Sequence, residues 1–407
     1  MVAGLVARAS AAGSEAALAE WVRGWAADRW PEIEWSVDLF QPGRANVVAR
    51  AQSGAVPELV LYSHLDTTLS GDRRADRFVV GSSPGPDRFE TDGELVSGPG
   101  VVVAKGPAAA VTVGFARAVE EARRSRRKHD LTLLLAAGGT HRATPHGGAQ
   151  ASAPQDRAGA GVARFLTGRR PDAALVAKAG PPGLLYEEPG AAFLVVRVEG
   201  PWAPVMARIR SLPDGGVPTA AGDAVAGVEH WRLAYRRRAL PERSQVGREV
   251  AVGALRCGLP DKPDLIGGLL ELYVYVIMGP EDDGAEIVDG LRAAVQAALA
   301  RGSGRGLSVA VEVSDLIVSA RTDPGRPIVR AAMAAWEAAN RRPAPEVRGW
   351  TGSTDGLALR AAGVDTVRLG PSPVPSPGGG EALRWSELRR YAQLYAEIAR
   401  RWITPSG

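Results

Sequence analysis

A His-x-Asp pair closes an apolar run at residues 59–67 and is the first candidate for chemistry. The run is short and ends in turn residues, which predicts a buried strand with His64 and Asp66 at its carboxyl end. Open α/β sheets build their sites at that end of their strands. His64 could therefore bind a metal ion, or act as an acid–base group that Asp66 orients. The simpler interpretation is that His64 ends a strand and Asp66 begins a turn.

Lysine is rare in this chain, which makes each lysine a candidate for a specific role. The 407 residues include only Lys105, Lys128, Lys178 and Lys262, and arginine supplies nearly all of the other positive charge. Lys178 directly follows a predicted strand at residues 172–177. It therefore stands at the same kind of position as His64.

The bulk composition is typical of a globular protein and argues against several classes of partner. The chain is 45% hydrophobic and 23% charged, and its length allows two or three hydrophobic cores. The net charge of +4 is small, and the basic cluster at residues 123–128 has no interleaved aromatic residues. We therefore expect no nucleic-acid partner. The single cysteine, Cys257, excludes internal disulfides and zinc sites built from cysteines.

We also expect a cytoplasmic protein without a membrane partner. A helix that spans a bilayer needs about 20 consecutive apolar residues, and we count no such run. The apolar residues near the start of the chain are too few for the core of a signal peptide.

Strands that alternate with helices predict an α/β unit up to about residue 190. Such alternation is typical of a mostly parallel sheet that is flanked by helices. The predicted strands are residues 33–37, 45–50, 59–67, 131–137 and 172–177, and the predicted helices are residues 10–29, 107–124 and 162–170.

The pattern then changes to longer β-rich runs, which predicts an inserted α+β domain over residues 191–317. After it the α/β pattern returns, so residues 1–190 and 318–407 together form the predicted catalytic-type domain. The predicted elements of the insertion are strands at 192–198, 271–276 and 307–313 and a helix at 285–301, and those after it are helices at 327–341 and 381–402 and a strand at 366–369.

Five short motifs follow one another along almost the whole chain. They are Tyr62-Ser63-His64-Leu65-Asp66, Gly98-x-Gly100 with Lys105-Gly106, Asp172-Ala173-Ala174-Leu175-Val176, Gly352-Ser353-Thr354-Asp355-Gly356, and Ala362-Gly363-Val364-Asp365-Thr366-Val367 with Gly370-Pro371. In this order the chain resembles the zinc-dependent amidohydrolase and exopeptidase family of acetylornithine deacetylase, succinyl-diaminopimelate desuccinylase and carboxypeptidase G. The resemblance implies a catalytic domain with two metal ions and an inserted lid domain that often mediates dimerisation.

Most of the metal-ligand positions that the resemblance implies are changed in this chain. The family's first His and its companion Asp are His64 and Asp66. The changed positions are Val103 for the metal-bridging Asp, Gly138 and Gly139 for a Glu-Glu pair, Lys178 for the next acidic ligand, and residues 375–381, which contain no His, for the last ligand. Two zinc ions need a bridging carboxylate and several His or carboxylate ligands. We therefore predict that the di-zinc site is lost and that the chain uses no metal cofactor.

The surviving residues could form a metal-independent active site. The Lys178 ammonium could stabilise an oxyanion, hold a substrate carboxylate, or act as base or nucleophile if its pKa is lowered. His64 and Asp66 could form an acid–base pair, with His141 nearby. In simpler interpretations Lys178 pairs with a carboxylate and His141 is exposed. The predicted catalytic residues are His64, Asp66, Lys178 and His141, and the predicted substrate-binding residues are Thr354, Asp355 and Lys105.

Two functions stay open at this point. The family's chemistry is hydrolysis of an amide on an amino-acid derivative. A repurposed, metal-independent enzyme would thus act on an acylated or amidated amino-acid derivative, by acyl transfer, cyclisation, elimination or hydrolysis. Its partners would be this small molecule and, through the inserted domain, a second copy of the chain as a homodimer. The alternative is a non-catalytic homologue that serves as a binding or scaffold protein.

Overall fold

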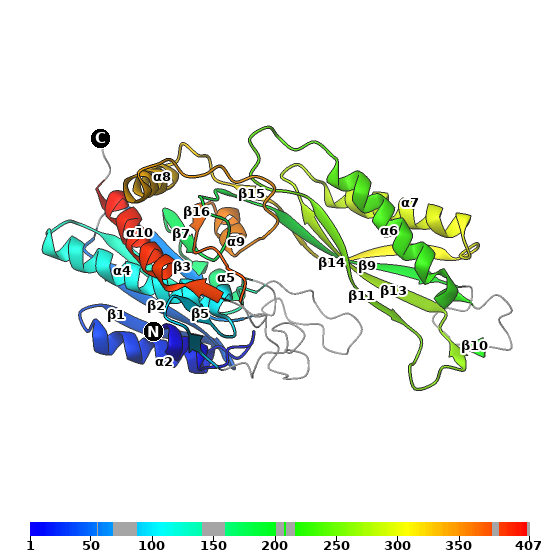
Figure 1. Ribbon diagram of the computed structural model, residues 1–407, viewed down its shortest axis with the longest axis horizontal. Helices are drawn as coiled ribbons and strands as arrows, with labels where there is room; N and C mark the ends of the chain where they lie inside the picture. Colours follow the sequence, from blue (N-terminus) through cyan, green and yellow to red (C-terminus); the bar gives the residue numbers. More distant parts are fainter. Residues whose placement is uncertain are drawn as a thin grey trace.

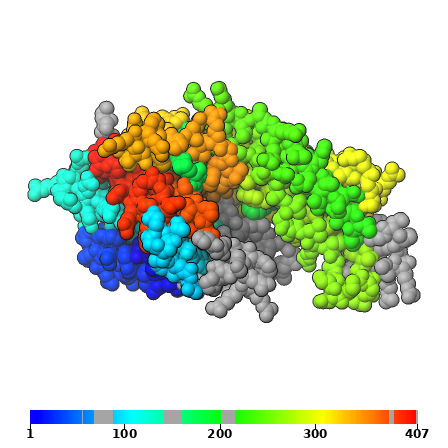
Figure 2. Space-filling model, viewed as in Figure 1, coloured from blue at the N-terminus to red at the C-terminus, as the bar shows by residue number. Residues whose placement is uncertain are grey.

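The computed structural model describes residues 1–54, 56–67, 88–140, 159–200, 207–208, 216–376 and 382–404. Two large sheets dominate it, and each has its own helices and buried core (Figure 1). Segments from both ends of the chain build the first unit. The C-terminal helix (red) lies beside the segment near residues 88–97 (cyan) in Figure 2, where the Trp385 indole donates to the Thr91 hydroxyl.

Six strands form the central sheet, in the order β1-β2-β6-β3-β7-β16. Strands β6, β3, β7 and β16 run parallel, and β1 and β2 add an antiparallel edge. The strands are β1 (Glu34–Gln41), β2 (Arg44–Gln52), β3 (Leu59–His64), β6 (Asp130–Ala136), β7 (Ala173–Ala177) and β16 (Asp365–Leu369). The predicted α/β class with a mostly parallel sheet is confirmed.

Strand β3 is buried along its whole length because helices cover both faces of the sheet. Leu59 and Leu61 face the larger core, whereas Val60 and Tyr62 face a smaller core on the other side. Side chains alternate between the faces of a strand, so a strand covered on both sides needs an unbroken apolar run. The helices of this unit are α1 (Val2–Val6), α2 (Ala16–Arg29), α4 (Gly106–Arg124), α8 (Pro327–Asn340) and α10 (Trp385–Ile403) on the larger core, and α5 (Ala160–Leu166) and α9 (Gly356–Ala361) on the smaller one.

Helix α4 and the π-helical turn before it form one long apolar segment, Val101–Arg124. By length and composition this segment could cross a membrane, which the sequence prediction had not allowed for. In the fold, 78% of its most apolar stretch is buried. Its apolar residues are explained by packing against β3 and α10, because a helix buried on most sides is apolar on most sides.

Two helices begin later than their sequence patterns predict. The predicted helix at residues 10–29 begins at Ala16, because Gly13 has a positive φ of 93° and its N–H bonds the Glu15 carboxylate in a turn. The predicted helix at 381–402 begins at Trp385, because β17 (Ala382–Arg384) first pairs with β5 (Leu95–Ser97). Shorter elements are β4 (Glu90–Thr91), β8 (Glu187–Glu188), β10 (Ala207–Arg208), β12 (Leu265–Ile266), β15 (Ala320–Arg321) and the 3-10 turn Val217–Ala220.

The second large sheet is antiparallel, in the order β11-β13-β9-β14, and two helices cover one of its faces (Figure 1). It comprises β9 (Gly190–Glu199), β11 (Glu249–Cys257), β13 (Leu269–Met278) and β14 (Ser308–Ile317), with helices α6 (Ala221–Arg236) and α7 (Gly284–Arg301). Strand β14 lies at an edge of this sheet. The sheet and its helices span residues 190–317, and the inserted α+β domain was predicted over residues 191–317.

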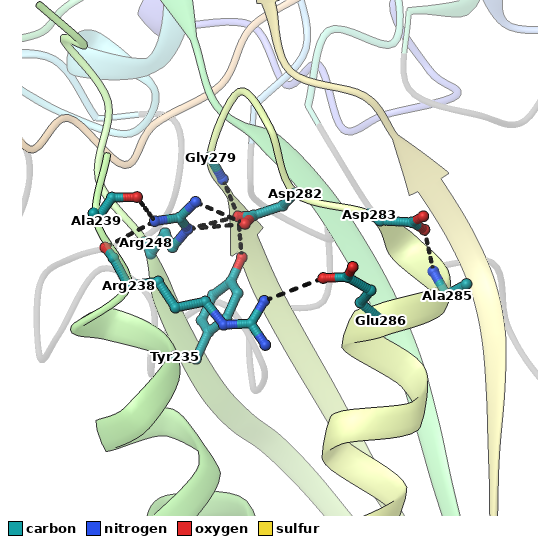
Figure 3. Close-up of polar contacts among 9 residues, drawn as sticks. All are labelled: Tyr235, Arg238, Ala239, Arg248, Gly279, Asp282, Asp283, Ala285 and Glu286. Atoms are coloured by element: carbon teal, nitrogen blue, oxygen red, sulfur yellow. Dashed lines mark hydrogen bonds and ion pairs between the residues drawn. The ribbon is translucent and has the colours of Figure 1, made fainter. Parts of the chain in front are cut away.

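The end of α6 contacts a buried ion pair that Arg248 and Asp282 form beside this second sheet (Figure 3). The Arg248 guanidinium donates from Nε and Nη2 to the Asp282 carboxylate, with Nη2 2.7 Å from Oδ1, and the two side chains are only 5% and 3% exposed. The Tyr235 hydroxyl at the end of α6 donates to Oδ2 of Asp282 at 2.6 Å. Burial and the Asp282 carboxylate together raise the pKa of Tyr235 well above its ordinary range. Further contacts are the Gly279 N–H to Asp282 and Nη1 of Arg248 to the carbonyls of Arg238 and Ala239.

We predict that Arg248→Met lowers the free energy of unfolding by about 3–5 kcal/mol, because it leaves the buried Asp282 carboxylate without its cation. The measurement is urea unfolding followed by circular dichroism. Arg238→Met is the matched control, since the Arg238 pair with Glu286 is 3.8 Å long and exposed, and its loss should cost about 1 kcal/mol or less. Equal losses in the two variants would contradict the importance of the buried pair.

Candidate functional site

Three neighbouring parallel strands bring charged and polar side chains to one face of the central sheet. The register aligns Tyr62 of β3, Val176 of β7 and Arg368 of β16. His64 and Lys178 each lie two residues further along, so the alternation of the strands directs them to the same face, nearer the carboxyl ends. This is the edge where open α/β sheets form their sites.

His64 and Asp66 form a buried pair. Nδ1 of His64 lies 3.2 Å from Oδ1 of Asp66, and the side chains are 1% and 0% exposed. The backbone N–H groups of Gly139 and Thr140 also donate to the carboxylate, at 2.6 and 2.8 Å. Burial would raise the pKa of Asp66, but the charge and hydrogen bond of His64 and the two N–H donors hold it well below its ordinary value. Asp66 therefore stays ionised and orients the imidazole.

The other ring nitrogen of His64 faces the rest of the cluster. With Asp66 ionised, Nδ1 of a neutral His64 is the donor, and Nε2 carries the lone pair. Within the described residues this buried Nε2 has no hydrogen-bond partner. Its proton-accepting site is thus left for a ligand or a solvent molecule.

Asp355 approaches the same edge from the turn before α9. The buried Tyr62 hydroxyl donates to its Oδ2 atom. Burial raises the pKa of Asp355 to about 6, although His64, Tyr62 and Lys178 act in the opposite direction. The carboxyl group of Asp355 is therefore poised to exchange a proton near neutral pH.

Lys178 is partly exposed and lies within electrostatic reach of Asp355 and Asp66. Burial of its ammonium lowers its pKa, and the positive charge of Arg368 lowers it further, against the pull of the carboxylates. Among the described residues the ammonium forms no ion pair, so the simpler interpretation of a paired Lys178 has no support there. The structure thus gathers four of the predicted site residues at one edge: His64, Asp66, Lys178 and Asp355.

The other predicted site residues have different surroundings. The Thr354 hydroxyl donates to the carboxylate of Glu188, which is also paired with Arg360 at 2.5 Å. The Lys105 ammonium is 2% exposed and donates to the carbonyl of Arg8 at 2.7 Å. His141 lies outside the described residues. The substrate-binding and catalytic roles assigned to these residues stay predictions.

Two members of the cluster were missed from the sequence. Tyr62 could have been found, because it precedes His64 by two residues and so shares its face of β3. Arg368 carried a weaker signal, as a lone charge in the otherwise apolar run Val367 to Leu369. Neither pattern shows that Tyr62 would meet Asp355, a partner 293 residues away in the chain.

The described residues do not fit a dinuclear zinc centre. A Cβ atom at Gly139 would lie 2.5 Å from Cβ of His64 and 2.9 Å from Oδ2 of Asp355, so a glutamate has no room there. Val103 has no ligand atom, and the cation of Lys178 would repel a metal ion. No group of three or more His, Cys, Asp or Glu residues within the described ranges could hold a metal ion. Because His141 falls outside those ranges, loss of the metal site remains a prediction.

We predict that Asp355→Asn changes how stability depends on pH. A native pKa near 6, above the ordinary 3.8, means that the native state binds the proton more tightly than the unfolded state. The contribution of Asp355 to stability is therefore full below about pH 4 and is lost as the pH rises through 6. We compare the free energy of unfolding of Asp355→Asn with that of the unmodified protein. This difference should shift by about 2 kcal/mol in favour of the variant between pH 4.5 and pH 7.5.

Urea unfolding at the two pH values measures this difference. Asp264→Asn, at a carboxylate that is 55% exposed, is the control and should follow the unmodified protein at both. If Asp355→Asn also follows it, Asp355 has no raised pKa.

No family model and no curated protein matches the chain. Solved structures do match it over almost its whole length. One is an M20 family metallo-carboxypeptidase from Sulfolobus solfataricus, with 11% identity, coverage of 99% and 98% of the two chains, and a TM-score of 0.69. Another is the aminopeptidase PepT from Bacillus cereus, with 16% identity, 98% and 96% coverage, and a TM-score of 0.63.

A hydantoinase/carbamoylase family amidase from Burkholderia ambifaria is similar as well, with 18% identity, 98% and 95% coverage, and a TM-score of 0.58. The family resemblance found in the sequence motifs is thus confirmed at the level of structure. The chain has the fold of the M20 metallopeptidases and the related amidohydrolases.

Proposed function

We propose that this protein is a metal-independent enzyme that acts on an acylated or amidated amino-acid derivative, with His64 as its acid–base group. The observation that carries the proposal is the buried His64–Asp66 pair, whose Nε2 atom has no partner among the described residues. An imidazole held by an ionised carboxylate is a common arrangement for proton transfer in enzymes.

In this proposal, Asp66 fixes the tautomer of His64. Nδ1 donates to Asp66, so Nε2 accepts a proton from the attacking group, which is either water or an amine of the substrate. The same nitrogen then returns the proton to the leaving group. General acid–base catalysis of this kind contributes about 10²–10⁴-fold to a rate.

Lys178 supplies the positive charge that this chemistry needs. Attack on an amide carbonyl creates an oxyanion, and a fixed cation in a partly dehydrated site stabilises it. Lys178 lies close enough to Asp355 and Asp66 to interact with both electrostatically, and without an ion pair to either among the described residues. It is therefore the cation that this proposal assigns to the oxyanion.

The substrate class is inferred from proteins of the same fold. The similar structures include an aminopeptidase, a carboxypeptidase and a hydantoinase/carbamoylase family amidase. By their names these proteins act on peptides or related amides. We extend this substrate class to the present chain. We also propose that the protein is cytoplasmic and forms a homodimer through the inserted domain.

A non-catalytic binding or scaffold protein is the second candidate. Two contacts favour it: His64 packs closely against Gly139, and the Tyr62 hydroxyl donates to Asp355. Both contacts occupy volume at the sheet edge that a substrate would need. In that case the site residues would serve packing alone, and no substrate would be turned over.

The test is hydrolysis of a panel of N-acyl amino acids, N-carbamoyl amino acids and dipeptides in the presence of a chelator. We expect turnover that EDTA leaves unchanged. His64→Gln should lower kcat by about 10²–10⁴-fold, since the base is removed. Lys178→Met should lower it by about 10²–10³-fold, since the oxyanion loses its cation.

Two surface substitutions are the controls. His230 is exposed on α6 and Lys262 is 58% exposed, so His230→Gln and Lys262→Met should retain full activity. Full activity in His64→Gln would remove that residue from the mechanism. Activity that is lost in EDTA and restored by zinc would overturn the metal-independent proposal, and no turnover of any substrate in the panel would favour the scaffold.

A further inference from the structure

Among the described residues, Arg368 is a buried cation without a carboxylate partner. It is 2% exposed on β16, and its Nη2 atom donates to the carbonyl of Ala179 at 2.6 Å. Its Nε and Nη1 atoms are also buried, and neither has a hydrogen-bond partner within the described residues. An unpaired buried charge costs several kcal/mol, so two unused guanidinium donors call for an explanation.

Glu188, an anion within electrostatic reach of Arg368, does not supply the missing partner. Glu188 interacts with Arg368 only at a distance, because one of its oxygens accepts from Thr354 and the other from Arg360. The hydroxyl of Tyr395, which also lies within electrostatic reach of Arg368, donates to the carbonyl of Leu369. Neither Glu188 nor Tyr395 therefore forms a hydrogen bond with Arg368 among the described residues.

Trp350 adds a third unused donor beside Arg368. The guanidinium carbon lies 4.6 Å from the centroid of the Trp350 ring, and the indole Nε1 is buried without a hydrogen-bond partner among the described residues. The backbone of Trp350 is fixed, since its N–H donates to Gln245 and its carbonyl accepts from Gly247, at 2.9 and 2.8 Å. The two side chains thus form a rigid stack.

The packing around this stack leaves little freedom for the donors to turn elsewhere. A Cβ atom at Gly180 would lie 3.0 Å from Nη2 of Arg368, and one at Gly352 would lie 2.5 Å from Cζ2 of Trp350. Glycine at both positions lets the backbone approach the stack closely. Trp350 and Lys178 are partly exposed, so the stack lies close to the protein surface.

We propose that Arg368 and Trp350 form a subsite for a small oxyanion, a carboxylate or a phosphate. The unpartnered N–H groups of Arg368 can donate charge-assisted hydrogen bonds to the oxygens of such a group, and the indole N–H adds a further donor. The nearby ammonium of Lys178 adds to the positive field. This site follows from the surroundings of Arg368 and stands whether or not His64 performs catalysis.

Isothermal titration calorimetry in the presence of EDTA tests the site with three probes: N-acetylglycine, its neutral analogue N-acetylglycinamide, and inorganic phosphate. We expect at least one of the two anions to bind, and N-acetylglycinamide to bind at least tenfold more weakly than N-acetylglycine if the carboxylate is the ligand. Binding of phosphate alone would identify a phosphate group as the source of the oxyanion.

Substitutions locate the binding. Arg368→Gln should weaken binding of the anion at least tenfold, and Trp350→Phe, which keeps a ring for the stack but loses the N–H, should weaken it several-fold. Arg326→Gln, at an arginine that is 57% exposed, should bind as the unmodified protein does. If neither anion binds, or if Trp350→Phe and Arg368→Gln both bind with unchanged affinity, the subsite does not exist.

Discussion

The candidate site depends on one buried carboxylate, that of Asp66. Its two oxygens accept hydrogen bonds from the N–H groups of Gly139 and Thr140, and one of them also faces the His64 ring. Burying an ion is costly, and these contacts are what make an ionised Asp66 possible there. They also join the end of β3 to the end of β6. The imidazole is oriented because its partner is fixed by the backbone.

The same geometry explains why Gly139 is a glycine. Its N–H must reach Asp66, and a side chain would collide with His64 and with Asp355. A sheet edge arranged in this way leaves no room for a carboxylate at Gly139. Under our proposal, the fixed cations Lys178 and Arg368 supply the positive charge that metal ions supply in a dinuclear site. Burial lowers the pKa of Lys178 and repulsion from Arg368 lowers it further, while the Asp355 and Asp66 carboxylates act in the opposite direction.

Much of the fold could be predicted because its signals are local. The short apolar runs that form β3, β6 and β7 are typical of strands covered on both faces, and their alternation with helices indicates a parallel sheet. The predicted start of α10 was wrong by a few residues, because the residues before it form β17. This strand pairs with β5, which lies almost 290 residues earlier in the sequence. Pairings of that kind leave no trace in a local pattern.

The positions of several candidate site residues could be predicted for a similar reason. His64, Asp66 and Lys178 could be found because each stands at the end of a predicted strand, where α/β sheets form sites. The stack of Arg368 on Trp350 could not, because it depends on which strands are neighbours and on which side chains lack partners. Sequence spacing carries neither kind of information.

We propose that this fold functions here without metal ions, and zinc titration is the decisive experiment. The untagged chain, purified with a chelator and then freed of it, is titrated with zinc by calorimetry, and its zinc content is measured after dialysis. We expect that no stoichiometric zinc is retained and that no binding tighter than about micromolar is seen, since Val103, Gly139 and Lys178 offer no ligand. Retention of two zinc ions per chain would contradict it.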